Sequence, residues 1–357
     1  MEKWIEESAK LPVIHEADLC VLGGSCTGVF AAVRAARLGL KAVIVEVHNC
    51  FGGVAANALV NIWHSLHSTD HSRQVISGLT EEILTRLAKR NAVVVKEGSI
   101  SSAFTLNTEE LKIELDELVV ESGVKPYLHT LFVAPYVRNG ELAGAVVENK
   151  DGRGVIKAKA FVDATGDADL AARLGLETYG SNQLQPGTTC VKLANLDQLS
   201  GKKISFSDLY LKHREEYALP ETFIWSCKVP GEQLSVSMLA GTRVRGDLSG
   251  ADALTAGEIE GRRQVRAMVD MIRKYGEGAA PTIVGLPSRI GVRETRHVRC
   301  LHQITGDELL YGIHYEDAIA NGTYPSDLHH QDREGITFRY LNGEQKLSRP
   351  GKETVKS

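Results

Sequence analysis

The stretch from Asp18 to Glu46 constrains the fold of this chain more than any other part of its sequence. An apolar strand over 18–22 leads into a glycine turn over 23–28, a helix of small residues follows over 29–38, and a second apolar strand over 41–46 ends on an acid. This order brings the free amides and the positive dipole end of a helix to the ends of two parallel strands, where a diphosphate binds. The sequence therefore predicts an α/β fold with a Rossmann-like dinucleotide site.

Four positions of this unit have separate tasks. Gly23 permits the tight turn, and Gly28 lets the helix approach the strand. Ser25 stands where the G-x-G-x-x-G pattern has its middle glycine, and a small side chain there still lets the backbone approach phosphate. Glu46 is expected to accept hydrogen bonds from a ribose diol and to repel a 2′-phosphate. Strand, helix and terminal acid all lie where such a site needs them.

The positions of the cysteines argue against several kinds of cysteine chemistry. Six are scattered along the chain without a C-x-x-C pair, which argues against disulfides and a zinc site. Cys26 is expected at a helix N-terminus, where the pKa of a thiol falls, although a small residue filling the turn is the simpler interpretation. Ala55 stands five positions after Cys50, where a flavin-linked disulfide reductase needs a second cysteine, so that chemistry is excluded.

Composition excludes several partners. The chain has 357 residues with a formal net charge of −4, and no basic run interleaved with aromatic residues, which argues against nucleic acid. No apolar stretch approaches the ~20 residues of a membrane helix, and the N-terminus lacks the pattern of a signal peptide. We expect a cytoplasmic protein with a small-molecule substrate, as a homo-oligomer or with an electron-transfer partner.

The periodicity predicts the other elements of a sheet. Residues 1–17 are expected to form an amphipathic helix and a linker, and helical patterns recur over 78–90 and 111–122. From His129 to Ala164 the period changes to two, with hairpin turns at 138–140 and 150–152. A parallel sheet with a βαβ unit is thus joined to an antiparallel β-meander.

Several separate segments resemble the FAD-dependent oxidoreductase family related to the fumarate reductase and succinate dehydrogenase flavoproteins. They are Gly23–Gly28, Glu46, Phe51–Gly53, the meander, Asp163–Leu170, Arg289–Arg296 and Tyr315–Asp327. The resemblance implies FAD as the cofactor, with Asp167 near the ribityl-diphosphate and the backbone of Phe132 and Val133 beside the adenine. The implied cofactor-binding residues are Gly23, Ser25, Cys26, Thr27, Gly28, Glu46, Val47, Gly52, Gly53, Val133, Thr165, Gly166 and Asp167.

The resemblance also implies a division of the chain. We expect an FAD-binding domain over 1–177, an inserted substrate or cap domain over 178–284, a return to the FAD-domain interface over 285–334, and a poorly ordered tail over 335–357. Members of the family usually close with a further glycine-containing strand and helix that hold the flavin ring, and nothing after Thr337 resembles it. A fragment, a truncated gene product or incomplete flavin binding would each explain this departure.

Catalytic candidates come from a basic segment that contains Arg289, Arg293, Arg296, His297 and Arg299. If this segment is a strand, alternation places Arg293 and Arg296 on opposite faces. In the resembled flavoproteins an arginine serves as an acid or an anion clamp, which makes Arg293 and Arg296 the candidates. The alternative is a solvated basic face with Glu294 as neighbour.

Three histidines, His64, His67 and His71, recur at helical spacing after the second glycine cluster. His64 is a candidate proton carrier near neutral pH. Ordinary polar packing is the favoured interpretation of the set, ahead of a metal site or covalent attachment of flavin, because only Asp70 adds a further ligand at suitable spacing.

The sequence as a whole predicts a flavin-dependent oxidoreductase that transfers a hydride between FAD and a small polar organic substrate. No second dinucleotide fingerprint occurs, because Gly276–Pro281 fails at its final position, so a dedicated NAD domain is not expected. The alternative is a non-catalytic or incomplete FAD- or NAD-binding subunit, or a truncated gene product.

Overall fold

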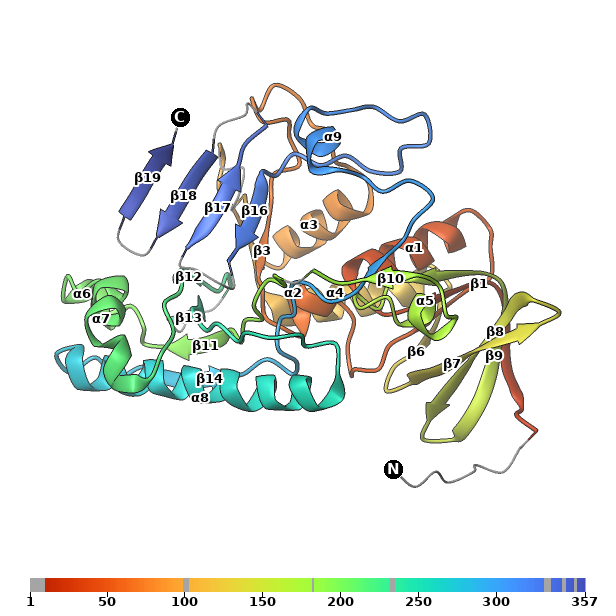
Figure 1. Cartoon of the computed structure of the whole chain (residues 1–357), viewed down its shortest axis with the longest axis horizontal. Helices are drawn as coiled ribbons and strands as arrows, with labels where there is room; N and C mark the ends of the chain where they lie inside the picture. Colours follow the sequence, from red (N-terminus) through yellow and green to blue (C-terminus); the bar gives the residue numbers. More distant parts are fainter. Residues whose placement is uncertain are drawn as a thin grey trace. The chain divides into compact units, whose positions relative to one another are not determined.

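The computed structural model describes residues 10–98, 103–181, 183–231, 235–330, 335–341, 345–349 and 352–356 (Figure 1). The chain divides into two compact units. The first consists of Met1–Phe51 and Leu115–Glu177, and the second of Gly52–Glu114 and Thr178–Ser357. The stretch that separates the two parts of the first unit ends within one helix, α4 (Thr108–Glu121).

The first unit is built on one six-stranded sheet, in the order β6-β2-β1-β9-β8-β7. Its strands are β1 (Val13–Leu22), β2 (Ala42–Val45), β6 (Lys125–Tyr127), β7 (Leu131–Arg138), β8 (Glu141–Asn149) and β9 (Gly152–Asp163), and its helices are α1 (Cys26–Arg37), α5 (Asp169–Arg173) and the end of α4. Strands β6, β2, β1 and β9 run parallel, and β8 and β7 continue antiparallel. The predicted fold class, a parallel sheet with a βαβ unit plus an antiparallel meander, is confirmed.

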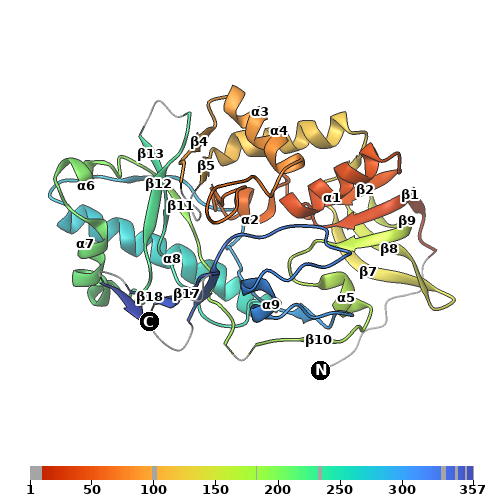
Figure 2. The same ribbon diagram turned by 90° about the horizontal axis from the view of Figure 1, so that it is seen from above.

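The burial of β1 and β2 in the core of this unit explains why the sequences of these strands are continuous apolar runs. Strands of a parallel sheet are covered on both faces, so successive residues are all apolar, and the four residues of β2 are all buried. Helix α1 lies along these strands in Figure 2. It buries Val29, Ala32 and Val33 completely, and the small side chains on this face let the helix lie close to the sheet.

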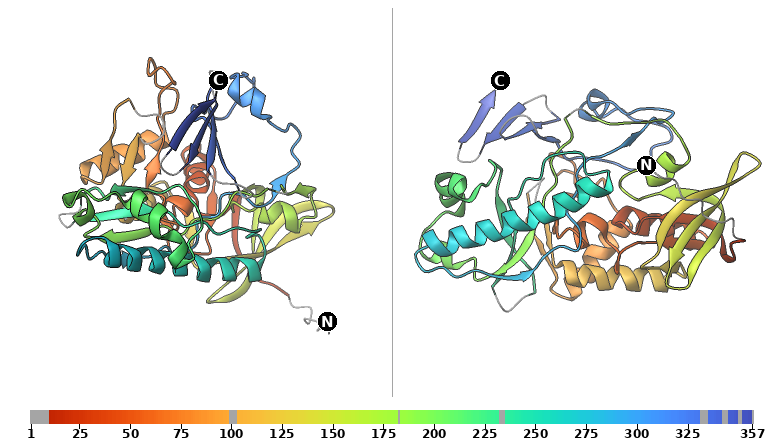
Figure 3. Two further views of the ribbon diagram at one scale, coloured as in Figure 1. Left: turned by 60° about the vertical axis from the view of Figure 1, so that its left-hand side comes forward. Right: turned by 60° about the horizontal axis from the view of Figure 1, so that its bottom comes forward.

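The described residues of the second unit form four smaller sheets, ordered β3-β5-β4, β12-β13-β11-β14, β10-β15 and β16-β17-β18-β19 (Figure 3). Its strands are β3 (Ile62–Trp63), β4 (Val93–Val95), β5 (Phe104–Leu106), β10 (Thr178–Tyr179), β11 (Val191–Ala194), β12 (Trp225–Lys228), β13 (Val236–Ala240), β14 (Thr282–Gly285), β15 (His297–Val298), β16 (Ser326–His329), β17 (Ile336–Arg339), β18 (Gln345–Arg349) and β19 (Lys352–Lys356). Its helices are α2 (Gly53–Ala56), α3 (Leu79–Lys89), the start of α4, α6 (Gln198–Gly201), α7 (Phe206–His213), the 3₁₀ helix η1 (Arg214–Tyr217), α8 (Ala251–Tyr275) and α9 (Gly306–Leu310).

Helix α8 organises the larger core of the second unit. Its residues Val265, Met268 and Ile272 are buried in one cluster with Leu193 of β11 and Leu239 of β13. Near its middle the helix approaches the segment before β11 so closely that a Cβ at Gly261 would lie 1.9 Å from Oγ1 of Thr189. A glycine is therefore required there by packing.

Two predicted features of the chain ends differ from the structure. Residues 1–9 lie outside the described part, but Val13 to Ala17, within the predicted helix and linker, are strand, because β9 is long enough to pair with them from Val155 onward. The stretch from Gly335, predicted to be poorly ordered from its polar composition, contributes β17, β18 and β19. Its first strand alternates apolar and polar residues, and Ile336 is only 2% exposed.

Within the described residues, no helix combines the length and the apolar character needed to cross a membrane.

Candidate functional site

The glycine turn between β1 and α1 leaves no room for side chains at two positions. Gly23 has a φ of 100°, and a Cβ there would lie 2.3 Å from the carbonyl oxygen of Ala164. A Cβ at Gly28 would lie 2.0 Å from the carbonyl oxygen of Gly23. The amide of Gly23 also donates to the carbonyl of Val45 at 2.8 Å, which ties the turn to the end of β2. The turn is thus a bare backbone cradle of the kind that diphosphates occupy.

Ser25 explains the departure from the usual glycine pattern. Its φ is −59°, so the backbone at this position has no need of glycine. Its hydroxyl accepts the amide of Gly28 at 3.1 Å and donates to the carbonyl of Ala164 at 3.4 Å. Serine is among the favoured N-cap residues because its oxygen satisfies an amide that the helix leaves unpaired. Ser25 therefore stabilises the start of α1 with a hydrogen bond that a glycine at this position could not make.

The carboxylate of Glu46 closes the turn from the other side. Glu46 is 6% exposed. Its Oε2 accepts the amide of Gly24 at 2.6 Å, and its Oε1 accepts the amide of His48 at 2.8 Å. Since each carboxylate oxygen has a second lone pair, both can still accept a ribose hydroxyl. A Cβ at Gly24 would lie 2.5 Å from Cδ1 of Phe51, so this glycine is also fixed by its surroundings.

The turn after β9 is held by a residue that sequence reasoning did not include among the cofactor ligands. Oδ1 of Asp163 accepts the hydroxyl of Thr165 at 2.7 Å, and its Oδ2 accepts the amides of Leu170 at 3.0 Å and Ala171 at 3.2 Å. The hydroxyl of Thr165 in turn accepts the amide of Asp169 at 3.1 Å. Asp163 and Thr165 therefore hold the start of α5, and they leave Gly166 and Asp167 at the turn itself.

The backbone of β7 is fixed at Val133 by a second residue that the sequence did not indicate. Arg173 of α5 donates from Nη1 to the carbonyl of Phe132 at 2.8 Å and to that of Val133. Its guanidinium also lies over the Phe132 ring, 5.4 Å from the centroid. The register of β7 against β8 shifts between Phe132 and Ala134. Arg173 thus holds an irregular point of the strand at the position proposed for adenine.

The remaining cofactor candidates are placed as follows. Cys26 and Thr27 form the first turn of α1, and burial raises the pKa of the Cys26 thiol to about 12, against a smaller lowering effect of a backbone amide. This supports the turn-filling role and not that of an activated thiol. Val47 is 47% exposed just after β2. Gly52 and Gly53 belong to the second unit, where both have positive φ and begin α2.

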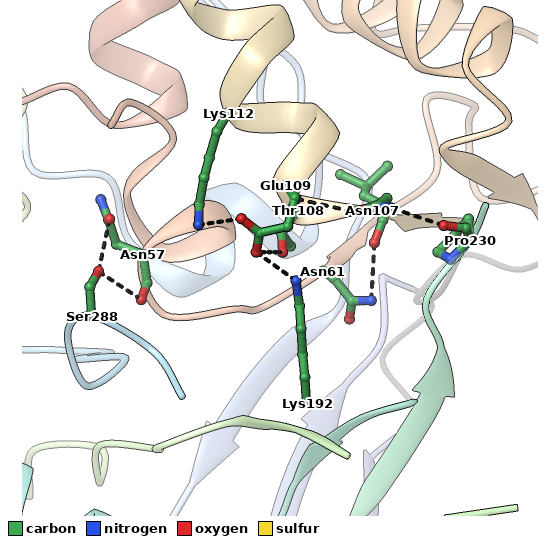
Figure 4. Close-up of polar contacts among 10 residues, drawn as sticks. Asn57, Asn61, Asn107, Thr108, Glu109, Lys112, Lys192, Pro230 and Ser288 are labelled. Atoms are coloured by element: carbon green, nitrogen blue, oxygen red, sulfur yellow. Dashed lines mark hydrogen bonds and ion pairs between the residues drawn. The ribbon is translucent and has the colours of Figure 1, made fainter. Parts of the chain in front are cut away.

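In the second unit the basic segment is a loop, and the alternation expected of a strand does not apply, because only His297 and Val298 of it are strand. Ser288, just before the segment, donates from its amide to the carbonyl of Asn57 at 3.0 Å. Its hydroxyl donates to Oδ1 of the same residue at 2.9 Å (Figure 4). Gly291 and Thr188 exchange two backbone hydrogen bonds of 2.9 Å. The loop is thereby fixed on both sides of the first arginines.

A polar network beside these contacts is structural. Lys192 of β11 is only 8% exposed, and its Nζ lies 2.7 Å from Oε1 of Glu109, whose Oε2 lies 2.8 Å from Lys112 (Figure 4). Burial alone would raise the pKa of Glu109, but the hydrogen bonds and charges of the two lysines hold it below its ordinary value. The buried lysine is therefore paired with a carboxylate.

Arg293 belongs to a cluster of titratable side chains. Its Nη2 donates to Oγ1 of Thr188 at 3.4 Å. The guanidinium reaches solvent, yet protein atoms surround it closely; this desolvation lowers its pKa, and the nearby Asp327 carboxylate raises it. Asp327 contacts His329, with 3.2 Å between Oδ1 and Nε2, and accepts the hydroxyl of Tyr324 at 3.2 Å. His64 stacks on Tyr324 with 3.8 Å between the ring centroids.

Of the three catalytic candidates, Arg293 and His64 thus lie in one cluster. Arg296 lies near Asp247 instead. The charge of Arg296 lowers the pKa of the Asp247 carboxyl, after the larger effect of hydrogen bonds from Ser249. Glu294, the expected neighbour of a solvated basic face, instead accepts the amide of Gln185 at 3.1 Å and contacts His297 at 2.9 Å. The loop directs neighbouring side chains to different partners.

The three histidines after the second glycine cluster do not share a helix face. Residues 64–78 are turns and loop, and His71 has a φ of 58°. In the part of the chain that the structure describes, no group of three or more His, Cys, Asp or Glu side chains is arranged to hold a metal ion. The sequence signal that could have located the cluster of Arg293 is the D-x-H pair of Asp327 and His329, which a strand places on one face.

The fold and the turn together define a dinucleotide-binding α/β protein. A family model described as FAD dependent oxidoreductase matches residues 18–350. The chain therefore belongs to the FAD dependent oxidoreductase family, whose cofactor is FAD. Its relation to the fumarate reductase and succinate dehydrogenase branch stays a prediction.

Curated proteins match over shorter stretches. Mitochondrial dihydrolipoyl dehydrogenase of Schizosaccharomyces pombe is 42% identical over 71 residues, which are 18% of this chain and 14% of that protein. Thiamine thiazole synthase of Methanococcus aeolicus is 25% identical over 181 residues, 48% of this chain and 64% of that protein. The chain thus spans less than two thirds of these curated relatives. Among solved structures, a geranylgeranyl bacteriochlorophyll reductase-like protein from Thermoplasma acidophilum is similar, with 15% sequence identity and a TM-score of 0.47. The match covers 78% of this chain and 66% of that protein's chain.

Proposed function

We propose that this chain binds FAD at the glycine turn of the first unit and transfers a hydride between FAD and a small polar organic substrate. The observation that carries the proposal is the cradle itself: Gly23, Gly24 and Gly28 have no room for a Cβ, and the buried Glu46 closes the turn. The lack of side chains at the turn, the start of α1 behind it and the acid after β2 together fit a dinucleotide diphosphate with an unphosphorylated ribose.

The assignment within FAD follows from the chemistry of each group. The diphosphate would lie at the amides of the turn and of the first residues of α1, where the helix dipole contributes ~0.3–1 kcal/mol. The ribose hydroxyls would bind Glu46, with a charged hydrogen bond of roughly 1.5–3 kcal/mol. Gly166 and Asp167 would face the ribityl-diphosphate, and the backbone of Val133 the adenine. The flavin supplies the hydride chemistry, and the protein supplies orientation and charge.

The substrate side of the proposal rests on Arg293. Its guanidinium reaches solvent among Thr188, Tyr324, Asp327 and His329, a set rich in hydrogen-bonding groups. Such a surface suits a small molecule with polar or anionic groups and not an apolar one. The cysteine pair of a disulfide reductase is missing, since Ala55 follows Cys50 at the required spacing, so the dihydrolipoyl dehydrogenase reaction is not proposed.

A stopped-flow assay tests this function. The chain is loaded with FAD, freed of oxygen, and mixed with panels of hydroxy acids, amino acids, amines and alcohols while the flavin absorbance is followed. The proposal expects bleaching by at least one polar class, and loss of that bleaching in Arg293→Met with FAD still bound. Full bleaching rates in Arg293→Met would move the chemistry elsewhere. Arg299→Met, a substitution of an exposed arginine in the same segment, is the matched control.

A further inference from the structure

We propose that Arg243, together with Thr188 and Arg293, binds the carboxylate group of a small organic acid. All three residues belong to the second unit, so the site is complete within that unit. Binding of the acid does not require FAD, and only its role as a substrate rests on the proposed function. Arg243 is a buried residue that neither the glycine motifs nor the basic segment indicated.

Arg243 is a buried cation that lacks an anionic partner among the described residues. It is 3% exposed. Its Nη1 donates to the carbonyl of Glu221 at a long 3.4 Å, and its Nη2 is buried without a hydrogen-bond partner in the described part of the chain. The carboxylate of Glu221 forms its ion pair with Arg214, at 3.4 Å. A buried charge is costly unless it is paired and hydrogen-bonded, so this guanidinium is suited to an anionic ligand.

Antiparallel pairing places the side chains of Arg243 and Thr188 beside each other. Gly187 and Val244 exchange two backbone hydrogen bonds, of 2.8 and 2.9 Å. The adjacent residues, Thr188 and Arg243, therefore form a non-hydrogen-bonded pair, in which the Cα atoms are about 4.5 Å apart and the side chains share one face. The amide and the carbonyl of Arg243 point away from this pair and bond to the side chain of Gln264, at 2.8 and 3.0 Å.

The segment that carries Arg293 pairs with the other edge of Thr188. Gly291 and Thr188 exchange two backbone hydrogen bonds of 2.9 Å. Two residues further on, Nη2 of Arg293 donates to Oγ1 of Thr188 at 3.4 Å. The Thr188 side chain thus has Arg243 on one side and Arg293 on the other.

Helix α8 covers the opposite face of this segment. A Cβ at Gly261 of α8 would lie 1.9 Å from Oγ1 of Thr189, so the helix packs against the face of the Thr189 side chain. Successive side chains of an extended segment point to opposite faces, which places Thr188 on the face that α8 does not cover. Arg243 and Arg293 share that face with Thr188.

A carboxylate matches these donors. A guanidinium offers two parallel N–H groups in a planar fork, and a carboxylate accepts both. The hydroxyl of Thr188 adds a further donor. Arg293 reaches solvent, and within the described residues its guanidinium makes only the hydrogen bond with Thr188. Side chains at binding sites commonly change rotamer when the ligand binds, so Arg293 can turn towards the acid and admit it to Nη2 of Arg243.

The charges around the site favour a carboxylate over a phosphate dianion. Burial lowers the pKa of Arg243 most, followed by the positive charges of Arg245 and Arg293. Two acids lie near the arginines: Glu221 raises the pKa of Arg243, and Asp327 raises that of Arg293. These acids repel a second negative charge on the ligand. Arg245 is exposed, so water and salt screen its contribution.

The first experiment uses the full chain without FAD and needs no knowledge of the natural acid. Its probe is sodium acetate, compared with sodium chloride at the same ionic strength and with neutral acetamide. A ligand that binds only the folded protein raises the unfolding temperature, so we expect acetate, and not acetamide, to stabilise the wild type. This effect should be lost in Arg243→Met and kept in Arg266→Met, which changes an exposed arginine of α8.

The same variants separate ligand binding from a structural role of Arg243. A buried charge without an anionic partner destabilises the free protein, so Arg243→Met in chloride should leave the urea midpoint unchanged or raise it. Arg243→Lys keeps the charge but not the planar fork, and should keep only part of the acetate effect. An urea midpoint that falls in Arg243→Met, with an acetate effect like that of the wild type, would show that the arginine is structural.

The second experiment measures affinity by calorimetry with lactate, succinate, benzoate and inorganic phosphate, and with lactamide as the neutral counterpart of lactate. A hydrogen bond to a charged group contributes enough that its loss weakens binding at least about tenfold. We expect this loss for the tightest carboxylate in Arg243→Met, and lactamide should bind at least about tenfold more weakly than lactate. Binding of phosphate but of no carboxylate would overturn the assignment to a carboxylate.

The two ways of failing can be told apart. An equal effect of acetate on the wild type and on Arg243→Met, including no effect on either, would overturn this inference and leave FAD binding untouched. A chain that binds the acid through Arg243 but takes up no FAD would overturn the proposed function alone.

Discussion

The amide nitrogen of Gly24 lies 2.6 Å from Oε2 of Glu46, so the acid that directly follows β2 also closes the turn that follows β1. The other oxygen of the same carboxylate accepts the amide of His48 at 2.8 Å. The residue expected to hold the ribose thus also shapes the cradle expected to hold the diphosphate. Substitutions in this turn should therefore change stability and cofactor affinity together, in proportions that depend on which contact is lost.

Glu46→Ala removes the acceptor of two backbone amides, those of Gly24 and His48, and the proposed ribose ligand. A charged hydrogen bond is worth roughly 1.5–3 kcal/mol, so we expect FAD affinity to fall at least about tenfold. Glu46→Gln keeps one acceptor oxygen and should fall between wild type and Glu46→Ala. FAD titration followed by fluorescence, with a thermal melt of each variant, measures both effects. The control is Glu117→Ala, which changes an exposed acid on α4. If Glu46→Ala bound FAD as tightly as the wild type, Glu46 would not belong to the site.

Gly24→Ala tests the close packing of the turn against Phe51 and Glu46. The new methyl group would lie 2.5 Å from Cδ1 of Phe51 and 2.9 Å from Oε2 of Glu46. Overpacking of this kind typically costs about 1–3 kcal/mol, and the displaced carboxylate should weaken FAD binding as well. Urea unfolding and FAD retention on a desalting column are the measurements. Gly180→Ala adds the same methyl group in open space, and a Gly24→Ala variant that behaves like it would argue against the close approach.

Ser25 separates helix capping from cofactor binding. Ser25→Ala removes the acceptor of the Gly28 amide and should lower the stability by about 0.5–2 kcal/mol, whereas Ser25→Gly should cost only a few tenths. Ser25→Gly also restores the common glycine pattern, so we expect it to bind FAD at least as tightly as the wild type. Chemical denaturation of the three proteins without FAD gives the order of stability. If Ser25→Ala proved as stable as the wild type, the hydrogen bond at 3.1 Å would have no energetic role.

Arg173 should matter for the adenine and not for the flavin. It holds the carbonyls of Phe132 and Val133 beside the shift in the register of β7. We expect Arg173→Met to weaken binding of FAD but to leave the weaker binding of FMN, which lacks adenine, unchanged, with Arg173→Lys in between. Parallel titrations with FAD and FMN give the ratio of affinities. The control is Arg138→Met, which changes an exposed arginine at the end of β7. If Arg173→Met lost as much affinity for FMN as for FAD, a role of Arg173 at the adenine would be contradicted.

Elements with strong local signals could be predicted from the sequence. The βαβ unit, the meander and the helices over 78–90 and 111–122 appear as β1-α1-β2, β7-β8-β9, α3 and α4, displaced by no more than a few residues. Their positions depend on periodicity and turn residues, which the sequence shows directly. The fold class and the cofactor followed from these elements and from the family resemblance.

The substrate side could not be predicted, because its contacts join segments far apart in the chain. The basic segment has a strand-like distribution of charges, but hydrogen bonds to Asn57 and Thr188 hold it as a loop. The spacing of His64, His67 and His71 imitates a helix without forming one. Asp327 and His329 show only a D-x-H spacing in the sequence, and the arrangement of β16 and its surroundings brings them and Tyr324 near Arg293. Similarly, the spacing of Asp163 and Arg173 gave no sign that they hold the turn and the strand beside them.

The binding of FAD by this chain is best tested with the visible absorption spectrum of the purified protein, with the bound cofactor released and identified. We expect a yellow protein that releases FAD at about one molecule per chain, or a colourless one that takes up FAD to that level when it is added. A folded chain that stays colourless in excess FAD would contradict it.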